Sequence, residues 1–417
     1  MTSSSPLDDR ERVRTAEIVS SLCLATDLGM GFPFEHGFHA TLMAACLADL
    51  LEVDMETKRY AYYFCLLDYV SCTTDAYGGA EIFAGEQTEN VIPHLWGSSL
   101  ERTRGVMRAM PPPDANPVLR VYEMARRIPR ALAGYKNHQR ALCEVAERMA
   151  LRLGLPPDYA QMFHFLTDRW DGKGALKRAS GDGMPMPIRI SMVARDLAFQ
   201  KLIGGEEHAL ATVTSRGGHA FDPHIVATLD DHARNVFAAG APDGNVWEAT
   251  LAAEPKPHLF LEEDEINDAL KVMAAFSDLL TPSLAGHSSG VAELVELAAH
   301  SAGFGDEDII DTRRAAWIHD IGRVAVSPAI WEKDGALTTD ETEQVRLHPY
   351  HAERVFASSP FLAILSQVAC CHHERLDGSG YHRGLTSQTI DARARLVAAA
   401  DVFHALTEPR AYRPPWV

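Results

Sequence analysis

The sequence predicts an all-α protein that contains two tandem helical domains. Three observations lead to this prediction. Most segments place hydrophobic residues at helical spacing, patterns typical of strands are sparse, and an eight-residue motif occurs twice in the chain. With 417 residues, the chain is long enough to bury one large hydrophobic core or two.

Composition and charge narrow the classes of function. The formal net charge is −18, which disfavours general nucleic-acid binding because an acidic surface repels the phosphate backbone. A small anionic substrate is still compatible, because metals or local cations can reverse the field in a pocket. The seven cysteines form no CxxC pair, the N-terminus is polar, and no apolar run reaches the ~20 residues that span a bilayer. We therefore expect a cytoplasmic protein with reduced thiols and without a membrane partner.

Amphipathic patterns in the first half predict four helices, at about residues 38–51, 57–68, 139–153 and 188–202. The third is closed by Gly154 and Pro156, residues that terminate helices. A segment at residues 240–258 is rich in Ala, Pro and Gly, which is typical of a boundary between domains. We therefore expect one domain at residues 1–255 and a second at residues 256–417.

Helix starts are clearer in the second half. Thr281 and Ser359 each precede a proline, which is the pattern of a capping hydroxyl followed by Pro at the first helical position. Thr338 and Glu341 have the spacing of a capping box. Pro349 follows within the same predicted helix, and we expect it to kink that helix because proline removes one hydrogen bond.

The two halves share an internal repeat. The segment RWDGKGAL at 169–176 is similar to RLDGSGYH at 375–382, and further pairs follow the same order along the chain. These pairs are His39 with His287, Asp68 with Asp320, and Asp196 with Asp401. Correspondences in one common order indicate two copies of one helical domain.

Histidines and aspartates of the second half stand at predicted helix ends, beside a proline or on an apolar helix face. They are His287, His319, Asp320, His348, His372, His373 and Asp401. One such histidine alone is usually a surface or core-edge residue, but their joint order predicts a metal site. Imidazole and carboxylate ligands suit Fe, Mn, Zn or Co, and two such ions can activate water for attack on phosphorus. We expect His351, His382 and His404 not to be ligands.

Further motifs of this region carry a resemblance to a known family. The segments are His319-Asp320-Ile321-Gly322, His348-Pro349, His372-His373-Glu374, Asp377-Gly378-Ser379-Gly380-Tyr381 and Ala400-Asp401-Val402-Phe403. With these motifs, residues 281–410 resemble the HD-GYP branch of the HD phosphohydrolase superfamily. The resemblance implies HD-type helical domains and a metal-dependent phosphodiesterase that hydrolyses cyclic di-GMP, often with iron or manganese.

The resemblance also implies roles for individual residues. One metal would be held by His287, His319, Asp320 and Asp401. The other would be held by Asp320, His348, His372 and His373, with Asp320 bridging the two. Catalytic roles would fall to Asp320 and Arg323, and substrate-binding roles to Arg323, Asp377, Gly378, Gly380 and Tyr381. The expected cofactors are two divalent ions, iron or manganese, with zinc, cobalt or nickel as alternatives.

The sequence departs from the family pattern at three positions. Arg323 replaces a lysine, so that a planar guanidinium would face the substrate phosphate. His382 replaces the proline of the Gly-Tyr-Pro motif, which removes a rigid backbone angle. Ser283 replaces a glutamate of members with three metals, which favours two metals here. The first two departures bear on the identity of the cyclic dinucleotide more than on the metal site.

The first copy keeps acidic residues but lacks imidazoles where the second copy has them. Leu67 stands in place of the histidine of the His-Asp pair, and Leu166 and Thr167 stand in place of the two adjacent histidines. We therefore expect the first copy to hold no dinuclear site, with its carboxylates paired to Arg169 or Lys173.

The leading prediction for function is hydrolysis of a cyclic dinucleotide, or of another nucleotide phosphoester, at a dinuclear metal site. The alternative is a metal- and nucleotide-binding sensor module of a transcriptional regulator, with little or no turnover. Tandem proteins of this appearance often carry a LuxR-type helix-turn-helix after the second HD domain, and this chain continues for only 16 residues after Asp401. It contains no basic recognition helix, so we expect no direct nucleic-acid binding. A homodimer is compatible with the sequence.

Overall fold

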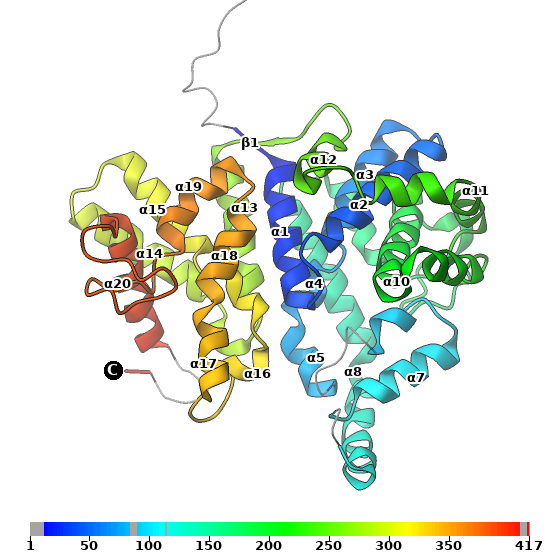
Figure 1. The fold of residues 1–417 in the computed structure, drawn as a ribbon, viewed down its shortest axis with the longest axis horizontal. Helices are drawn as coiled ribbons and strands as arrows, with labels where there is room; N and C mark the ends of the chain where they lie inside the picture. The colour runs from blue at the N-terminus through cyan, green and yellow to red at the C-terminus, as the bar shows by residue number, and fades with distance from the viewer. Residues whose placement is uncertain (1–11, 84–89, 113–114, 409–414, 417) are drawn as a thin grey trace, which may run out of the picture.

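The computed structural model describes residues 12–83, 90–112, 115–408 and 415–416. Within these residues the protein is helical apart from one short pair of strands (Figure 1). The strands β1 (Val13–Arg14) and β2 (Phe260–Leu261) pair in antiparallel fashion. The prediction of an all-α protein is therefore confirmed.

The first half contains the four predicted helices, together with shorter ones. Its elements are α1 (Thr15–Met30), α2 (His36–Leu50), α3 (Met55–Leu67), α4 (Val70–Thr74), α5 (Ala76–Ile82), η2 (Ile92–His94), α7 (Ser99–Ala109), α8 (Pro117–Arg152), α9 (Pro157–Gln161), η3 (Met162–Phe165), η4 (Gly181–Gly183), α10 (Met186–Ser215), α11 (Pro223–Ala239) and α12 (Val246–Ala252). The helix predicted near residues 139–153 is only the end of α8. This helix begins much earlier because Asn116 caps it by accepting a hydrogen bond from the backbone N–H of Leu119.

The second half consists of shorter helices whose ends carry the predicted ligands. Its elements are α13 (Glu263–Asp278), η5 (Pro282–Leu284), α14 (His287–Ser301), α15 (Asp306–Ile318), η6 (Ile321–Ala325), α16 (Pro328–Trp331), α17 (Thr339–Arg346), α18 (His348–Phe356), α19 (Pro360–Ala369) and α20 (Ala392–Thr407). The capping box of Thr338 and Glu341 is present, and Ser359 caps α19. Thr281 forms no side-chain capping bond, and only a 3-10 turn follows it.

The expected kink at Pro349 is absent, because α17 ends at Arg346 and a new helix starts at His348. Pro349 therefore lies in the first turn of α18, where a backbone N–H has no helical partner to lose. This break places His348 at a helix start, which directs its ring toward the interior.

The internal repeat is visible in the lengths and packing of the helices. Helices α1 and α13 have 16 residues each, α2 and α14 have 15, and α3 and α15 have 13. In the first half α2, α3 and α10 pack on one another, and in the second half α14, α15 and α20 do the same. The two halves thus repeat one arrangement of helices.

The halves join through α1 and α13, which lie near the centre of the molecule (Figure 1). Helix α1 packs on η6 of the second half, and α13 packs on α4 of the first. A Cβ atom on Gly29 of α1 would lie 2.3 Å from Cγ2 of Thr73 and 3.4 Å from Cβ of Val324. Because α1 is enclosed this closely, one continuous hydrophobic core runs through both halves.

The segment 240–258, expected to be a boundary, is packed against the first half. It contains α12, whose Trp247 is buried, and it contains the buried carboxylate of Glu254. This carboxylate accepts hydrogen bonds at 2.6 Å from the Tyr63 hydroxyl and from Nε of Arg14. An alanine-rich composition suits a short helix as well as a linker. The division into domains at 1–255 and 256–417 stays a prediction.

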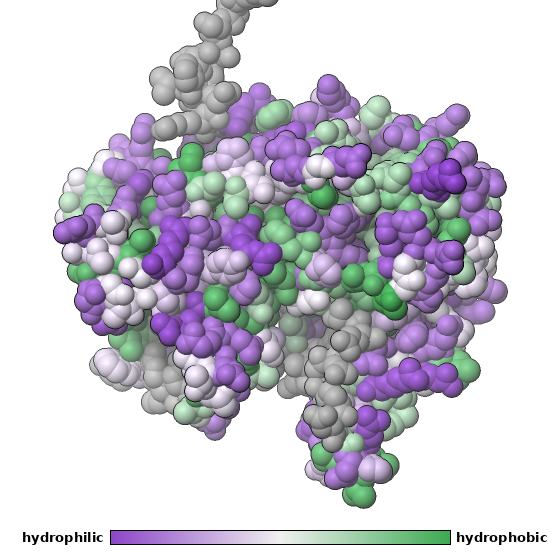
Figure 2. Space-filling view, viewed as in Figure 1, coloured by the Kyte–Doolittle hydropathy of each residue, from purple (hydrophilic) through white to green (hydrophobic). Residues whose placement is uncertain are grey.

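The surface carries both hydrophilic and hydrophobic residues. Figure 2 shows hydrophilic residues over much of the visible face, with smaller hydrophobic areas between them. Exposed large hydrophobic side chains are spread over several elements, including α8, α14 and α20. Among the described residues, no helix is both long and apolar enough to cross a membrane.

Candidate metal centre

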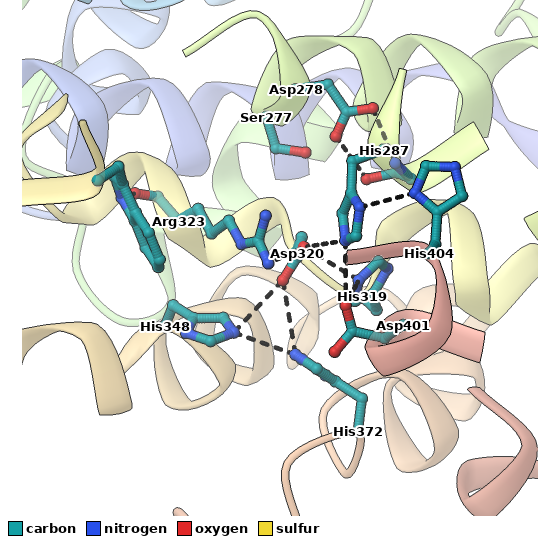
Figure 3. Close-up of polar contacts among 12 residues, drawn as sticks. Ser277, Asp278, His287, His319, Asp320, Arg323, His348, His372, Asp401 and His404 are labelled. Carbon is teal, nitrogen blue, oxygen red and sulfur yellow. Dashed lines mark hydrogen bonds and ion pairs between the residues drawn. The ribbon is translucent and has the colours of Figure 1, made fainter. Parts of the chain in front are cut away.

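The side chains predicted as metal ligands converge in the second half, and Figure 3 labels all of them except His373. They come from the first residues of two helices, from the ends of two more and from the middle of α20, and they are His287, His348, His319, Asp320, His372, His373 and Asp401. Every one except His373 is buried. The fold therefore brings together donors that are up to 114 residues apart in sequence.

Local contacts explain why α14 begins at His287. Gly286 has a φ of 84°, in the left-handed region that glycine adopts without strain. Asp278, the last residue of α13, accepts hydrogen bonds from Ser288 N at 2.9 Å and from Ser288 Oγ at 2.6 Å. Burial raises the pKa of Asp278 to about 6. These contacts hold the first turn of α14 against α13 and direct His287 inward (Figure 3).

The first group of donors consists of His287, His319, Asp320 and Asp401, with one ligand atom of each within 4.8 Å of the others. His287 Nε2 lies 3.0 Å from Asp401 Oδ1 and 3.6 Å from Asp320 Oδ2. His319 Nε2 lies 3.0 Å from the same oxygen of Asp320. Donor atoms about 2.0–2.2 Å from a common ion have separations of this size.

The second group consists of His348, His372 and His373. The Nε2 atoms of His348 and His372 lie 3.0 Å apart. The other oxygen of Asp320, Oδ1, lies 3.3 Å from His348 Nε2 and 3.5 Å from His372 Nε2. Asp320 thus presents one oxygen to each group, which is the arrangement of a carboxylate that bridges two ions.

The orientation of the rings fits metal binding. His319, His348 and His372 each donate Nδ1–H to the backbone carbonyl oxygen three residues earlier, at 2.7 Å. A neutral ring that donates through Nδ1 keeps a lone pair on Nε2, which faces the centre. His319 Nε2 and both carboxylate oxygens of Asp320 are buried without a hydrogen-bond partner of normal geometry among the described residues. Since buried polar atoms normally have hydrogen-bond partners, these atoms, which have only ion-pair contacts, fit two divalent ions.

The charge states at the centre also suit ligands. Burial alone would raise the pKa of Asp320, but Arg323 and His319 hold it well below its usual value. For Asp401, a hydrogen bond to an imidazole likewise outweighs burial and lowers the pKa. Burial lowers the pKa of His348 to about 4. At neutral pH the carboxylates are therefore ionised and this imidazole is neutral, which are the forms that bind metals.

Arg323 lies in η6, next to the bridging carboxylate. Its side chain is buried, and Nη2 lies 2.7 Å from Asp320 Oδ2. The guanidinium stacks over Trp331, with 5.1 Å between Cζ and the ring centroid. Its Nε and Nη1 atoms are buried and have no hydrogen-bond partner among the described residues. Arg323 therefore offers unsatisfied donors at the centre, and its ion pair is with Asp320, away from the surface.

The glycine-rich loop brings one predicted residue to the centre. Tyr381 packs on His373, with 4.8 Å between ring centroids, and burial raises the pKa of Tyr381 to about 12. Gly380 makes this contact possible, because a Cβ atom there would lie 2.4 Å from the backbone N of Arg375. Gly380 therefore matters because it lets the backbone of this loop pass close to Arg375.

The other loop residues shape the turn itself. Asp377 is exposed, and its carboxylate accepts hydrogen bonds from Ser379 N at 3.0 Å and from Ser379 Oγ at 2.6 Å. Gly378 has a φ of 78°, again in the left-handed region. The structure thus gives Asp377 contacts within its own loop, and the substrate-binding roles of Asp377 and Gly378 stay predictions.

Sequence reasoning missed two side chains beside the first group. His404 was expected not to be a ligand, and its Nδ1 atom lies 3.1 Å from Nδ1 of the predicted ligand His287. Glu408 Oε2 lies 3.2 Å from both nitrogens. The signal was available, because residues 401, 404 and 408 share one helix face. His382, in contrast, pairs with a carboxylate of α18 at 2.9 Å and belongs to neither predicted ligand group.

The first copy shows what replaces the donors. Helices α2 and α14 begin with His36 and His287, each after a residue with positive φ, so the structural counterpart of His287 is His36 and not His39. Helices α3 and α15 are equally long, so Asp68 takes the place of His319 and Tyr69 that of Asp320. The pairing of Asp68 with Asp320 expected from the sequence was therefore one residue out of register.

A cation occupies the corresponding centre of the first copy. Arg195 is the tenth residue of α10, as Asp401 is of α20, so Arg195 and not Asp196 is its counterpart. Nε of Arg195 lies 2.6 Å from Asp68 Oδ2, and its guanidinium lies 3.7 Å from the ring centroid of Tyr69. Arg195 also lines a small cavity together with His36. The guanidinium supplies the positive charge that metal ions would supply in the second copy.

Other acidic residues of the first copy are paired as well. Asp171 pairs with Arg169 at 3.1 Å, as expected, and lies 3.9 Å from Lys173. Asp196 forms a buried ion pair with Arg216. Among the described residues, all three groups that could hold an ion lie in the second half. That only the second copy binds metal stays a prediction.

Comparison with known proteins also points to an HD domain in the second half. Residues 266–416 match the family model of the HD domain. A 3'3'-cGAMP-specific phosphodiesterase 3 of Vibrio cholerae is 27% identical over 402 residues, which cover 95% of this chain and 87% of the relative. The cyclic di-GMP phosphodiesterase response regulator RpfG of Xanthomonas campestris is 38% identical over 122 residues, which cover 29% of this chain and 32% of the relative.

A solved structure has the same fold. The crystal structure of a cyclic GMP-AMP-specific phosphodiesterase of V. cholerae superposes with a TM-score of 0.64 at 23% identity, and the match covers 95% of this chain and 89% of the other. The likeness extends through both halves, so the tandem arrangement is shared. The HD domain at residues 266–416 and these phosphodiesterase relatives support the resemblance to the HD-GYP branch of the HD superfamily.

Proposed function

We propose that the chain is a metal-dependent phosphodiesterase that hydrolyses a cyclic dinucleotide at the centre around Asp320. The observation that carries this proposal is the pair of donor groups that share this carboxylate. Similarity over 95% of the chain to a 3'3'-cGAMP-specific phosphodiesterase supports the class of reaction, as do shorter matches to cyclic di-GMP phosphodiesterases. The product would be the linear dinucleotide.

The residues of the centre have separate tasks in this reaction. When bound, two divalent ions supply Lewis acidity and an activated water at neutral pH. Asp320 holds the two donor groups at a fixed separation, and the backbone carbonyls keep the imidazole rings aligned. Arg323 faces the phosphate, because a guanidinium fork matches two phosphate oxygens. Tyr381 forms a wall of the centre beside His373.

The donor set bears on the identity of the ions. Imidazole nitrogens and carboxylate oxygens, without a cysteine among them, suit borderline divalent metals. We propose iron or manganese as the physiological ions, with zinc, cobalt and nickel able to occupy the same donors. Metal analysis of protein purified without chelator would identify them.

The test of function uses protein loaded with Mn²⁺ or Fe²⁺ and offered 3'3'-cGAMP and cyclic di-GMP separately. We expect a linear dinucleotide from at least one substrate, and none after treatment with chelator or with His319→Ala. Protein that contains two ions per chain but leaves both substrates intact would contradict the proposal. Tight binding of either nucleotide without turnover would identify a sensor module.

A further inference from the structure

His287 differs from the other buried imidazoles of the centre in how its ring is oriented. His319, His348 and His372 each lie near a helix end, and each donates Nδ1–H to a backbone carbonyl three residues earlier. His287 is the first residue of α14, preceded by Gly286 in the left-handed conformation. The backbone changes direction just before His287. His287 Nδ1 contacts side chains from the C-terminal end of α20.

Helix α20 and the residue after it place one carboxylate beside each nitrogen of the His287 ring. Asp401 Oδ1 lies 3.0 Å from Nε2 of His287, on the side of the ion site. Glu408 Oε2 lies 3.2 Å from Nδ1, on the opposite side. Asp401 and Glu408 are two helical turns apart and so lie on one face. The ring is therefore held between a ligand carboxylate and a second carboxylate (Figure 3 shows the Asp401 and His404 sides).

Close packing fixes this arrangement. His404 lies between the two carboxylates in sequence and sits on Gly290 of α14, where a Cβ atom would lie 1.8 Å from His404 Nε2. Only a glycine leaves room for the ring there. The contact between His404 and Gly290 fixes the position of α20 along α14, and this position places Glu408 beside His287.

We propose that Glu408 is a positioning residue of the metal centre, accepting the Nδ1–H bond of His287 so that Nε2 carries the lone pair for the ion. A carboxylate in this place fixes the tautomer and raises the basicity of the ligand nitrogen. His404 is the competing acceptor, since its Nδ1 lies 3.1 Å from the same atom. Glu408 is favoured over His404 as the acceptor, because its negative charge offsets the positive charge of a nearby divalent ion. A neutral imidazole cannot do this.

The test compares metal affinity among variants by competition with a chelator, ion by ion, on folded protein. Glu408→Ala should weaken one of two ions by about 10–100-fold and spare the other, the usual effect of removing such a partner. Glu408→Gln should retain part of the affinity, because an amide oxygen still accepts the bond. His404→Ala should lose less than Glu408→Ala. Asp340→Asn, at an exposed position of α17, is the control and should match the parent.

Three outcomes would overturn the proposal. The first is parent-like affinity of Glu408→Ala for both ions. The second is a larger loss for His404→Ala than for Glu408→Ala. The third is a parent protein with three ions and a Glu408→Ala variant with two, since His287, His404 and Glu408 would then be ligands of a third ion. If Glu408→Ala does not fold, the comparison of Glu408→Gln with His404→Ala decides. The proposal concerns ion affinity within the proposed metal centre, so it fails separately from the proposed function, whose failure would be absent turnover by fully loaded protein.

Discussion

At the scale of single residues, the two copies provide a positive partner for a central carboxylate in different ways. A buried carboxylate needs a positive partner, because desolvation of an unpaired charge is costly. In the second copy, Asp320 is surrounded by imidazole nitrogens and Arg323. In the first copy, Asp68 has the guanidinium of Arg195. Substitutions at the two arginines should therefore have different consequences.

Replacement of Arg323 should affect the substrate and spare the ions. A guanidinium has no lone pair for a metal, but it donates charge-assisted hydrogen bonds worth roughly 1.5–3 kcal/mol each. Arg323→Ala should therefore keep two ions and lower affinity or turnover about tenfold or more, while Arg323→Lys retains much of both. Nucleotide binding, hydrolysis and metal content measured on the two variants check this. Equal activity of Arg323→Ala and the parent would exclude a phosphate contact.

Replacement of Arg195 should affect stability and spare the metal centre. Arg195→Met leaves the half-buried carboxylate of Asp68 without its partner. Breaking a fully buried pair costs about 3–5 kcal/mol, which sets the upper limit here. The free energy of unfolding from denaturant titration should fall by this order, with metal content unchanged. The double variant Asp68→Asn, Arg195→Met should lose less, because it leaves no buried charge. A loss of metal in the single variant would place an ion in the first copy.

At the scale of elements, the sequence was most informative where one residue type has a local effect. The capping box at Thr338 and the cap at Ser359 marked real helix starts. The kink at Pro349 was wrong because proline also suits a first helical turn. The register of the repeat was out by one residue at Asp68 and Asp196 and by three at His39. It depends on where helices begin and end, which caps and turns decide. The helix face that His404 and Glu408 share with Asp401 could be predicted, but their contact with His287 could not, since it follows from the approach of α20 to α14.

The two glycine loops provide a matched pair of substitutions. A Cβ atom on Gly380 would meet the backbone of residues 373–375 at 2.4–2.6 Å, and a Cβ atom on Gly174 would meet that of residues 167–169 at 2.5–3.1 Å. Both Gly380→Ala and Gly174→Ala should destabilise the fold, because backbone cannot yield as a flexible side chain does. Only Gly380→Ala should also release metal, since its loop carries His373 and Tyr381. Metal retention in Gly380→Ala with unchanged stability would show that the loop tolerates the side chain.

At the scale of the whole molecule, the metal-binding half is supported by the half that lacks the predicted donors. Helix α1 packs on η6, which carries Arg323, and on α18, which begins with His348. Across the same contact Glu17 accepts a hydrogen bond from Ser359 at 3.0 Å, and Arg354 stacks on Phe34 at 4.4 Å. The first copy thus packs against the elements that carry Arg323 and His348.

Because the core is continuous, both halves should unfold together. We expect a single thermal transition for the full chain by calorimetry, with equal calorimetric and van't Hoff enthalpies. Residues 256–417 produced alone should be less stable and bind metal more weakly, because the faces that contact α1 would be exposed. Two separate transitions, with one matching an isolated fragment that keeps full metal affinity, would show independent domains.

The most direct test of the dinuclear centre is anomalous X-ray diffraction from crystals of protein loaded with Mn²⁺ or Fe²⁺. We expect two anomalous peaks per chain, about 3.5–4 Å apart on either side of Asp320. One peak should lie among His287, His319 and Asp401, and the other should lie among His348, His372 and His373. Density beside Arg195 should show no peak. A single peak, an empty second half, or a peak in the first copy would contradict a dinuclear centre confined to the second half.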